Sequence, residues 1–151
     1  LALEQNGHEF YTQAAERTIA EKGKKMYLSL AEDEVLHAEV IQRQMDALTE
    51  GEGWIAPEGV DEVDADLETP LFPAGQAEFE EAVRPDASDL DALVFALKIE
   101  NDSFDLYLEQ AKAAEDPNAK RLYEYLVDAE RTHFNLLMLN YESLNEQSAW
   151  V

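Results

Sequence analysis

Apolar residues recur at steps of three and four along four long stretches of the chain, the spacing that places side chains on one face of an α-helix. This pattern predicts helices over about 1–18, 21–48, 89–114 and 117–145. Ser88 and Asp116 stand just before the third and fourth stretches, where a short polar side chain can cap a helix, and Pro117 suits a first helical position. The sequence therefore predicts an all-α chain.

The region between the second and third predicted helices has a different composition. From Asp46 to Asp91 it contains fifteen acidic residues, one basic residue and four of the five prolines. Such a stretch predicts a connection over about 49–88, within which residues 75–83 could form a short helix. The other turns are short, so the helices that each joins should be antiparallel. We expect one domain (1–151), a four-helix bundle of two antiparallel hairpins with a long acidic crossover.

Two polar residues interrupt the apolar face of the second predicted helix. Glu34 and His37 fall on the stripe that its apolar residues form. Burying a charge without a partner is costly. The pattern therefore predicts that these side chains have a partner in the core.

The same polar residues recur in the second half of the chain at an offset of 96. Glu34 aligns with Glu130 and His37 with His133, so Glu-x-x-His occurs twice in one register. The register also aligns Glu4 with Glu100, Tyr11 with Tyr107, Tyr27 with Tyr123, Leu30 with Leu126, Lys24 with Lys120 and Lys25 with Arg121. In two antiparallel hairpins, residues equally far from a turn sit at one height, so the four glutamates and two histidines should meet in one layer.

Four carboxylates and two imidazoles form a donor set suited to iron or manganese. Buried together, four carboxylates would repel one another, and two divalent cations would balance their charge. The predicted metal ligands are Glu4, Glu34, His37, Glu100, Glu130 and His133. A polar core layer held by hydrogen bonds without metal is the alternative for the same residues.

Two further residues lie close to this set but are not predicted as ligands. His8 stands one helical turn from Glu4, and its counterpart at the offset is Phe104. Asp33 precedes Glu34 and could orient a ligand histidine, although its counterpart is Ala129.

The ligand pattern resembles that of the ferritin-like superfamily, and within it the rubrerythrin-like proteins. The resemblance covers the four predicted helices and implies two iron ions, with manganese as an alternative. It implies that Glu4 and Glu100 are terminal ligands, that Glu34 and Glu130 are bridging and catalytic, and that His37 and His133 bind one iron each. Tyr11 and Tyr107 could hydrogen-bond the ligand carboxylates.

The chain departs from rubrerythrins in two places. It has no cysteine and so no rubredoxin iron site, which means that electrons would come from an external donor. Ser103 stands where rubrerythrins carry an extra glutamate. The resemblance implies an oxidoreductase that uses O₂ or peroxide, as a ferroxidase or a peroxide reductase. A non-catalytic iron-binding or storage subunit, a di-iron hydroxylase of an organic substrate and a metal-free scaffold are the alternatives.

The charge of the chain narrows the choice of partners. A formal net charge of −23 would repel nucleic acid and anionic membranes and would attract cations, although most acidic side chains simply solvate a surface. No run approaches the ~18 apolar residues of a membrane span. We expect a cytoplasmic homodimer whose partners are metal ions, O₂ or peroxide and an electron donor.

Overall fold

The computed structural model describes residues 1–72 and 88–151. Among these residues there are four helices and no strand: α1 (Ala2–Arg17), α2 (Glu21–Thr49), α3 (Asp89–Ala113) and α4 (Pro117–Gln147). The prediction of an all-α chain with four helices is confirmed, and every helix ends within two residues of its expected limit. The short helix considered for residues 75–83 lies outside the described residues.

The predicted caps of the two later helices are both present. The Ser88 hydroxyl accepts a hydrogen bond of 3.0 Å from the backbone N–H of Asp91 at the start of α3. The Asp116 carboxylate accepts bonds of 2.8 and 3.3 Å from the backbone N–H groups of Asn118 and Ala119, at the start of α4. Each cap satisfies N–H groups that have no partner within the helix, so these starts are fixed by local sequence.

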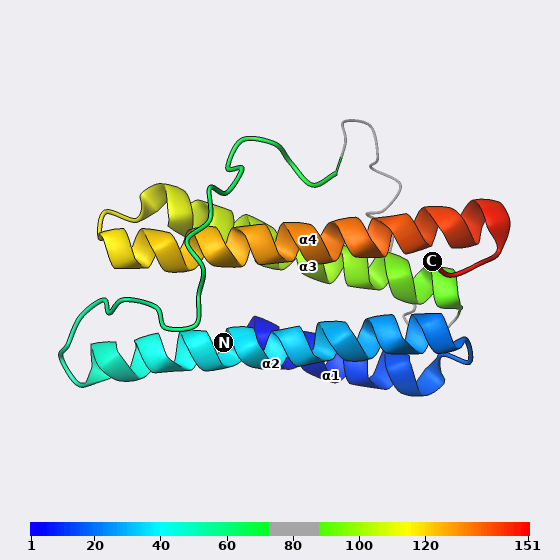
Figure 1. The fold of residues 1–151 in the computed structure, drawn as a ribbon, viewed down its shortest axis with the longest axis horizontal. Helices are drawn as coiled ribbons and strands as arrows, with labels where there is room; N and C mark the ends of the chain where they lie inside the picture. Colours follow the sequence, from blue (N-terminus) through cyan, green and yellow to red (C-terminus); the bar gives the residue numbers. More distant parts are fainter. Residues whose placement is uncertain (73–87) are drawn as a thin grey trace.

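The helices are arranged as two pairs. α1 packs against α2 and α3 packs against α4, and the two pairs lie one above the other in Figure 1. Residues 18–20 join the first pair and residues 114–116 join the second. This arrangement is consistent with a four-helix bundle. Within residues 1–72 and 88–151, no helix combines the length and the hydropathy that crossing a bilayer requires.

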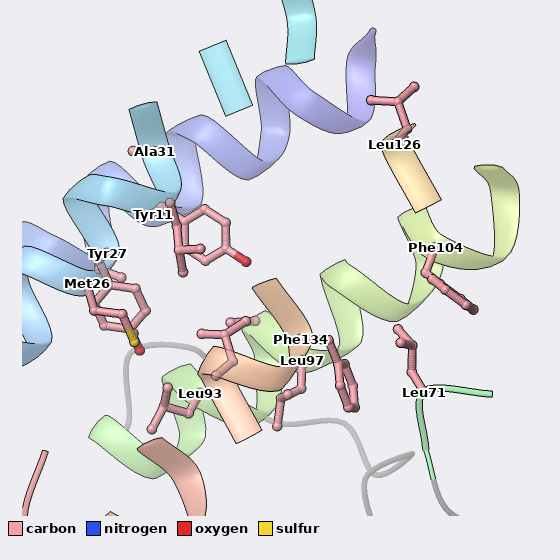
Figure 2. Close-up of a cluster of buried hydrophobic side chains, with 14 of the residues drawn as sticks. Tyr11, Met26, Tyr27, Ala31, Leu71, Leu93, Leu97, Phe104, Leu126 and Phe134 are labelled. Atoms are coloured by element: carbon pink, nitrogen blue, oxygen red, sulfur yellow. The ribbon is translucent and has the colours of Figure 1, made fainter. Parts of the chain in front are cut away.

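The apolar core draws large side chains from all four helices. Its fully buried members include Leu30 and Leu137 and, labelled in Figure 2, Tyr11, Tyr27, Leu93, Leu97, Phe104 and Leu126. Burying one large apolar side chain stabilises the fold by ~1.5–3 kcal/mol. The core thus provides the rigid frame in which the buried polar residues sit.

The connecting segment, residues 50–88, is attached to α4 over its described part. Arg121 Nη2 donates to the carbonyl of Val60 at 2.8 Å. Arg131 Nη2 donates to the carbonyls of Asp66 and Thr69 at 3.0 and 2.6 Å. Further on, Leu71 joins the same core cluster as Phe104 and Phe134 (Figure 2). Phe72 adds an edge-on contact with Phe134 at 4.9 Å. The segment is therefore held through its backbone and through apolar side chains that pack on the core, contacts that its sequence did not predict.

The residues after α4 fold back onto the start of α2. Ser148 has a left-handed backbone (φ 55°), and the backbone N–H of Val151 donates to Asn140 Oδ1 at 3.0 Å. This turn places the Trp150 ring over Gly23, where an added Cβ would lie only 2.6 Å from the indole. Glycine at position 23 therefore permits the contact, and Tyr27 meets the same ring edge-on at 5.9 Å.

Candidate metal centre

All six predicted ligand residues are buried. None of them exposes more than 5% of its surface, and together they come from all four helices: Glu4 on α1, Glu34 and His37 on α2, Glu100 on α3, and Glu130 and His133 on α4. The polar interruptions seen in the apolar stripes therefore lie inside the protein.

Four of the six form a group that could hold a metal ion. One ligand atom from each of Glu34, Glu100, Glu130 and His133 lies within 4.8 Å of the others. His133 Nδ1 is 3.5 Å from Glu34 Oε1, 3.5 Å from Glu100 Oε1 and 3.7 Å from Glu130 Oε2. The group combines three helices, and its donors converge on one imidazole nitrogen.

His37 lies against the same group. Its Nδ1 is 3.6 Å from Glu34 Oε2 and 3.5 Å from Glu130 Oε1. The rings of His37 and His133 stack with their centroids 5.5 Å apart. Glu34 and Glu130 therefore each direct one oxygen toward each histidine, so that both carboxylates stand between the two imidazoles.

Glu4 stands at the side of this group. Its Oε2 lies 3.4 Å from the Leu1 ammonium. It lines a surface groove together with Glu34. Gly7, one turn later on α1, leaves room for Glu34, because an added Cβ would lie 3.3 Å from the carboxyl carbon of Glu34. Glu4 is thus adjacent to the four-residue group but is not a member of it.

The two predicted tyrosine partners behave differently. The Tyr11 hydroxyl donates a hydrogen bond to Glu100 Oε1, so a tyrosine of α1 supports a glutamate of α3. Burial and the charge of Glu100 raise the pKa of Tyr11 well above its ordinary value, which keeps the hydroxyl protonated as a donor. The Tyr107 hydroxyl is also buried, but it has no hydrogen-bond partner among residues 1–72 and 88–151.

Asp33 contacts a ligand-type histidine from across the bundle. Its Oδ2 lies 3.1 Å from His133 Nε2, on the opposite side of the ring from the carboxylate group. This hydrogen bond to His133 is the main reason that the pKa of Asp33 falls below its ordinary value. The sequence pointed to Asp33 as a residue that could orient a ligand histidine because it directly precedes Glu34. Tyr125, whose ring meets His37 edge-on at 5.9 Å, gave no such signal because its counterpart at the offset is Ser29.

Both imidazoles titrate above their ordinary range. Burial alone would lower the pKa of His37, but the carboxylates of Glu130 and Glu34 outweigh it and raise this pKa to about 9. Burial would likewise lower the pKa of His133, yet Asp33 and the carboxylate group raise it well above its ordinary value. In the absence of a metal ion, the surrounding carboxylates therefore favour the protonated form of both rings.

The carboxylates respond to the same crowding. Burial, and then the charge of Glu130, raise the pKa of Glu100. Burial would also raise the pKa of Glu130, but the neighbouring Glu100 carboxyl and the His133 and His37 imidazoles lower it. Burial raises the pKa of Glu4 as well. Protons thus compensate part of the buried negative charge, which is the role that a bound cation would take over.

Several ligand-type atoms of the cluster are buried without a hydrogen bond. Within the described part of the chain, these atoms are both oxygens of Glu4 and of Glu130, Oε2 of Glu100, and Nδ1 of His37 and of His133. A buried polar atom left unpaired costs about 1–3 kcal/mol. These oxygens and nitrogens are the donor types that bind iron, manganese or zinc, so the residues fit a metal ion.

Fold and site together define an all-helical protein with a buried glutamate–histidine cluster that could hold a metal ion. Comparison of the chain with protein-family models, with curated proteins and with solved structures found no match. The resemblance to rubrerythrin-like proteins therefore remains a prediction from the ligand pattern.

Proposed function

We propose that the protein is a di-iron carboxylate protein of the ferritin-like superfamily, similar to rubrerythrins, and that it oxidises bound Fe(II) with O₂ or peroxide. The observation that carries the proposal is the placement of Glu34 and Glu130 between His37 and His133. A carboxylate that directs one oxygen to each of two imidazoles is arranged to bridge two metal ions.

Charge supports two ions over one. Four buried carboxylates carry up to four negative charges, which two divalent cations would balance while releasing the protons on His37 and His133. Glu34 and Glu130 would bridge the ions, and Glu4 and Glu100 would complete one ion each. Imidazole and carboxylate donors suit iron and manganese.

The helix arrangement supports the ferritin-like part of the proposal. α1 packs on α2 and α3 packs on α4, and in each pair the helices are joined by only a few residues. We take these pairs as the two antiparallel hairpins of such a bundle, with the connecting segment as the crossover between them. Such a bundle places glutamates and Glu-x-x-His pairs from four helices in one core layer.

The chain supplies charge compensation, positioning and exclusion of water. Bound Fe(II) would supply the electrons that reduce O₂ or peroxide. Tyr11 orients Glu100, and Asp33 orients His133, so two of the donors are fixed before metal arrives. With no cysteine in the chain, a further round of reduction depends on an external electron donor.

The proposal is tested with protein that has been stripped by a chelator and loaded with Fe(II) without oxygen. Stopped-flow mixing with O₂ or H₂O₂ should raise the near-ultraviolet absorbance of carboxylate-bound ferric iron faster than Fe(II) in buffer does. The Glu34→Ala/Glu130→Ala double variant should lose this phase, whereas Glu32→Ala, an exposed change on α2, should keep it. If wild type gives no ferric absorbance with either oxidant, the proposed reaction is wrong.

One observation favours a second candidate, the hydroxylation of an apolar organic substrate. A pocket of about 420 Å³ is lined mainly by apolar side chains, among them Ile41, Met45, Leu106 and Leu122, and by Tyr107. An apolar pocket of this size is typical of small-molecule sites. Incubating the iron-loaded, reduced protein with toluene and O₂ should then give an oxygenated product by mass spectrometry. Leu106→Trp, which fills the pocket, should abolish that product without removing iron.

A further inference from the structure

The two histidines of the cluster are held differently. His133 binds Asp33 through Nε2 at 3.1 Å, which leaves Nδ1 facing the carboxylates. The equivalent support for His37 would come from position 129, where the chain has alanine. A carboxylate on the outer ring nitrogen fixes the orientation of a ligand histidine and raises its basicity. His133 is therefore oriented by a carboxylate from outside the cluster, whereas His37 has no such carboxylate at the equivalent position and meets the Tyr125 ring edge-on.

The two predicted terminal ligands, Glu100 and Glu4, also differ in the hydrogen bonds that their neighbours make to them. Glu100 accepts the hydroxyl of Tyr11. Glu4 has an ion pair with the Leu1 ammonium at 3.4 Å, but no tyrosine supports it, because the Tyr107 hydroxyl, which would make the equivalent contact, has no hydrogen-bond partner among the described residues. The half of the cluster with Glu100 and His133 is thus the half whose ligands are fixed by their neighbours.

The less supported half is also the half that faces a groove. A surface groove of about 310 Å³ has a mainly apolar lining that includes Leu1, Val35 and Ala38, and Glu4, Glu34 and Glu39 also line it. His8 is held by a contact of 3.0 Å between its Nδ1 and the carbonyl of Ala31. Because Glu4 and Glu34 both line this groove, it is the route by which ions in solution would reach Glu4.

We infer that the two metal positions are inequivalent. The His133 position, formed by Glu100 and His133 with Glu34 and Glu130, binds first and tightly. The Glu4 position, formed by Glu4 and His37 with the same two bridging glutamates, binds second, more weakly, and exchanges its ion through the groove. This inference rests on the proposed two-metal centre and adds to it an order of loading and an exchangeable position.

Preorganisation explains the expected order. Ligands that are already oriented lose less freedom on binding, so the ion they receive is held more tightly. Asp33 acts here as a positioning residue, because it contacts His133 and no predicted metal position. Its removal should therefore affect one binding step and spare the other, which a general loss of stability would not do.

Titration of the chelator-stripped protein with Co(II), followed by visible absorbance and by calorimetry, tests the inference. Wild type should show two steps that differ by about tenfold or more in affinity. Asp33→Ala should weaken the tight step by about 10–100-fold and leave the weak step unchanged. Glu4→Gln should remove the weak step and keep one tightly bound ion. Glu32→Ala, the exposed neighbour of Asp33 in the sequence, should match wild type in both steps.

The outcomes separate this inference from the proposed function. Two steps of equal affinity in wild type, equal weakening of both steps by Asp33→Ala, or loss of the tight step in Glu4→Gln would overturn the inequivalence while leaving a two-metal centre in place. No binding of Co(II) at all would overturn both.

Discussion

The first half of the chain (residues 1–49) and the second half (residues 88–147) carry the same ligand types at the same register but support them differently. Glu34 and Glu130 occupy matching places between the two histidines. Asp33, by contrast, has alanine as its counterpart, and the hydrogen bond made by Tyr11 is not made by Tyr107. The positions that repeat at the offset of 96 determine which ligand side chains come together. The positions at which the two halves differ in sequence or in contacts determine which of those side chains are fixed by hydrogen bonds.

A second matched pair shows that the repeat also serves the fold. Gln44 and Asn140 are both buried and lie 96 residues apart. Gln44 donates to the carbonyl of Gly53 at 2.9 Å and accepts the N–H of Ile55 at 3.1 Å, and Asn140 accepts the N–H of Val151 at 3.0 Å. Each amide therefore fastens the backbone that follows its own helix.

The largest expected effect comes from removing either of the two glutamates that the halves have in common, Glu34 and Glu130. Glu34→Ala and Glu130→Ala each remove a carboxylate that contacts both histidines, so each variant should lose about two metal ions per chain. Elemental analysis of the purified variants measures this directly. Glu32→Ala on α2 and Glu142→Ala on α4 are exposed controls that should retain the metal content of wild type. Retention of both ions in either Glu34→Ala or Glu130→Ala would contradict the bridging role.

Substituting Tyr11 and Tyr107 tests whether the two halves differ in the hydrogen bonds that support their ligands. In metal-free protein, Tyr11→Phe removes a buried hydrogen bond to Glu100 and should lower the free energy of unfolding by about 1–3 kcal/mol. Tyr107→Phe removes a hydroxyl that has no partner among the described residues, so its effect should be near zero or stabilising. Urea denaturation followed by circular dichroism compares the two. Equal losses would mean that the halves are supported alike.

The two halves also differ at a position outside the cluster, where the first half has Gly23 and the second half has Ala119. Gly23→Ala makes the halves alike but places a Cβ 2.6 Å from the Trp150 ring, which must then move. Helix propensity favours alanine by about 1 kcal/mol, and overpacking of the added Cβ against the indole should cost about 1–3 kcal/mol, so the expected change is a small net loss. Tryptophan fluorescence should shift to longer wavelength.

The matched background for this test is Trp150→Ala. Without the indole, Gly23→Ala meets no ring and should stabilise the protein by about 1 kcal/mol. A destabilising effect of the same size in both backgrounds would show that Trp150 is not what requires glycine.

The stability of the metal-free protein should also depend on pH. The pKa of His37 is raised to about 9 in the folded protein from an ordinary value of 6.5, so the protonated ring stabilises the fold. This contribution is fully present below about pH 6.5 and is lost as the pH rises through about 9. The melting temperature of chelator-treated protein should therefore fall across this interval, and less so in His37→Gln. His8→Gln is the control and should keep the dependence of wild type.

Local sequence accounts for much of the fold and for the members of the cluster. Helix limits and caps follow from apolar spacing and from Ser88 and Asp116, which act on their own neighbours. The cluster members are recognisable because charged residues on an apolar stripe need a partner and because one register aligns them.

What the sequence did not predict depends on contacts between distant residues. The bond from Asp33 to His133 spans α2 and α4, and the alignment argues against it because position 129 is alanine. The contact of the Trp150 ring with Gly23 depends on the left-handed backbone of Ser148 and on the packing of the end of α4 near the start of α2. Neither relation has a periodic signature, since each is created only when the helices come together.

The connecting segment is attached by arginines of α4 that bind its carbonyl groups, at Val60, Asp66 and Thr69. A carbonyl is common to every amino acid, so these attachments do not select the side chains of the segment. The acidic side chains of residues 50–72 are exposed, so reversing their charge can leave these attachments in place, provided that the two arginines and the apolar residues that pack on the core, such as Leu71, remain. Those exposed acidic positions are thus open to change by evolution or an engineer without disturbing the core and its buried cluster.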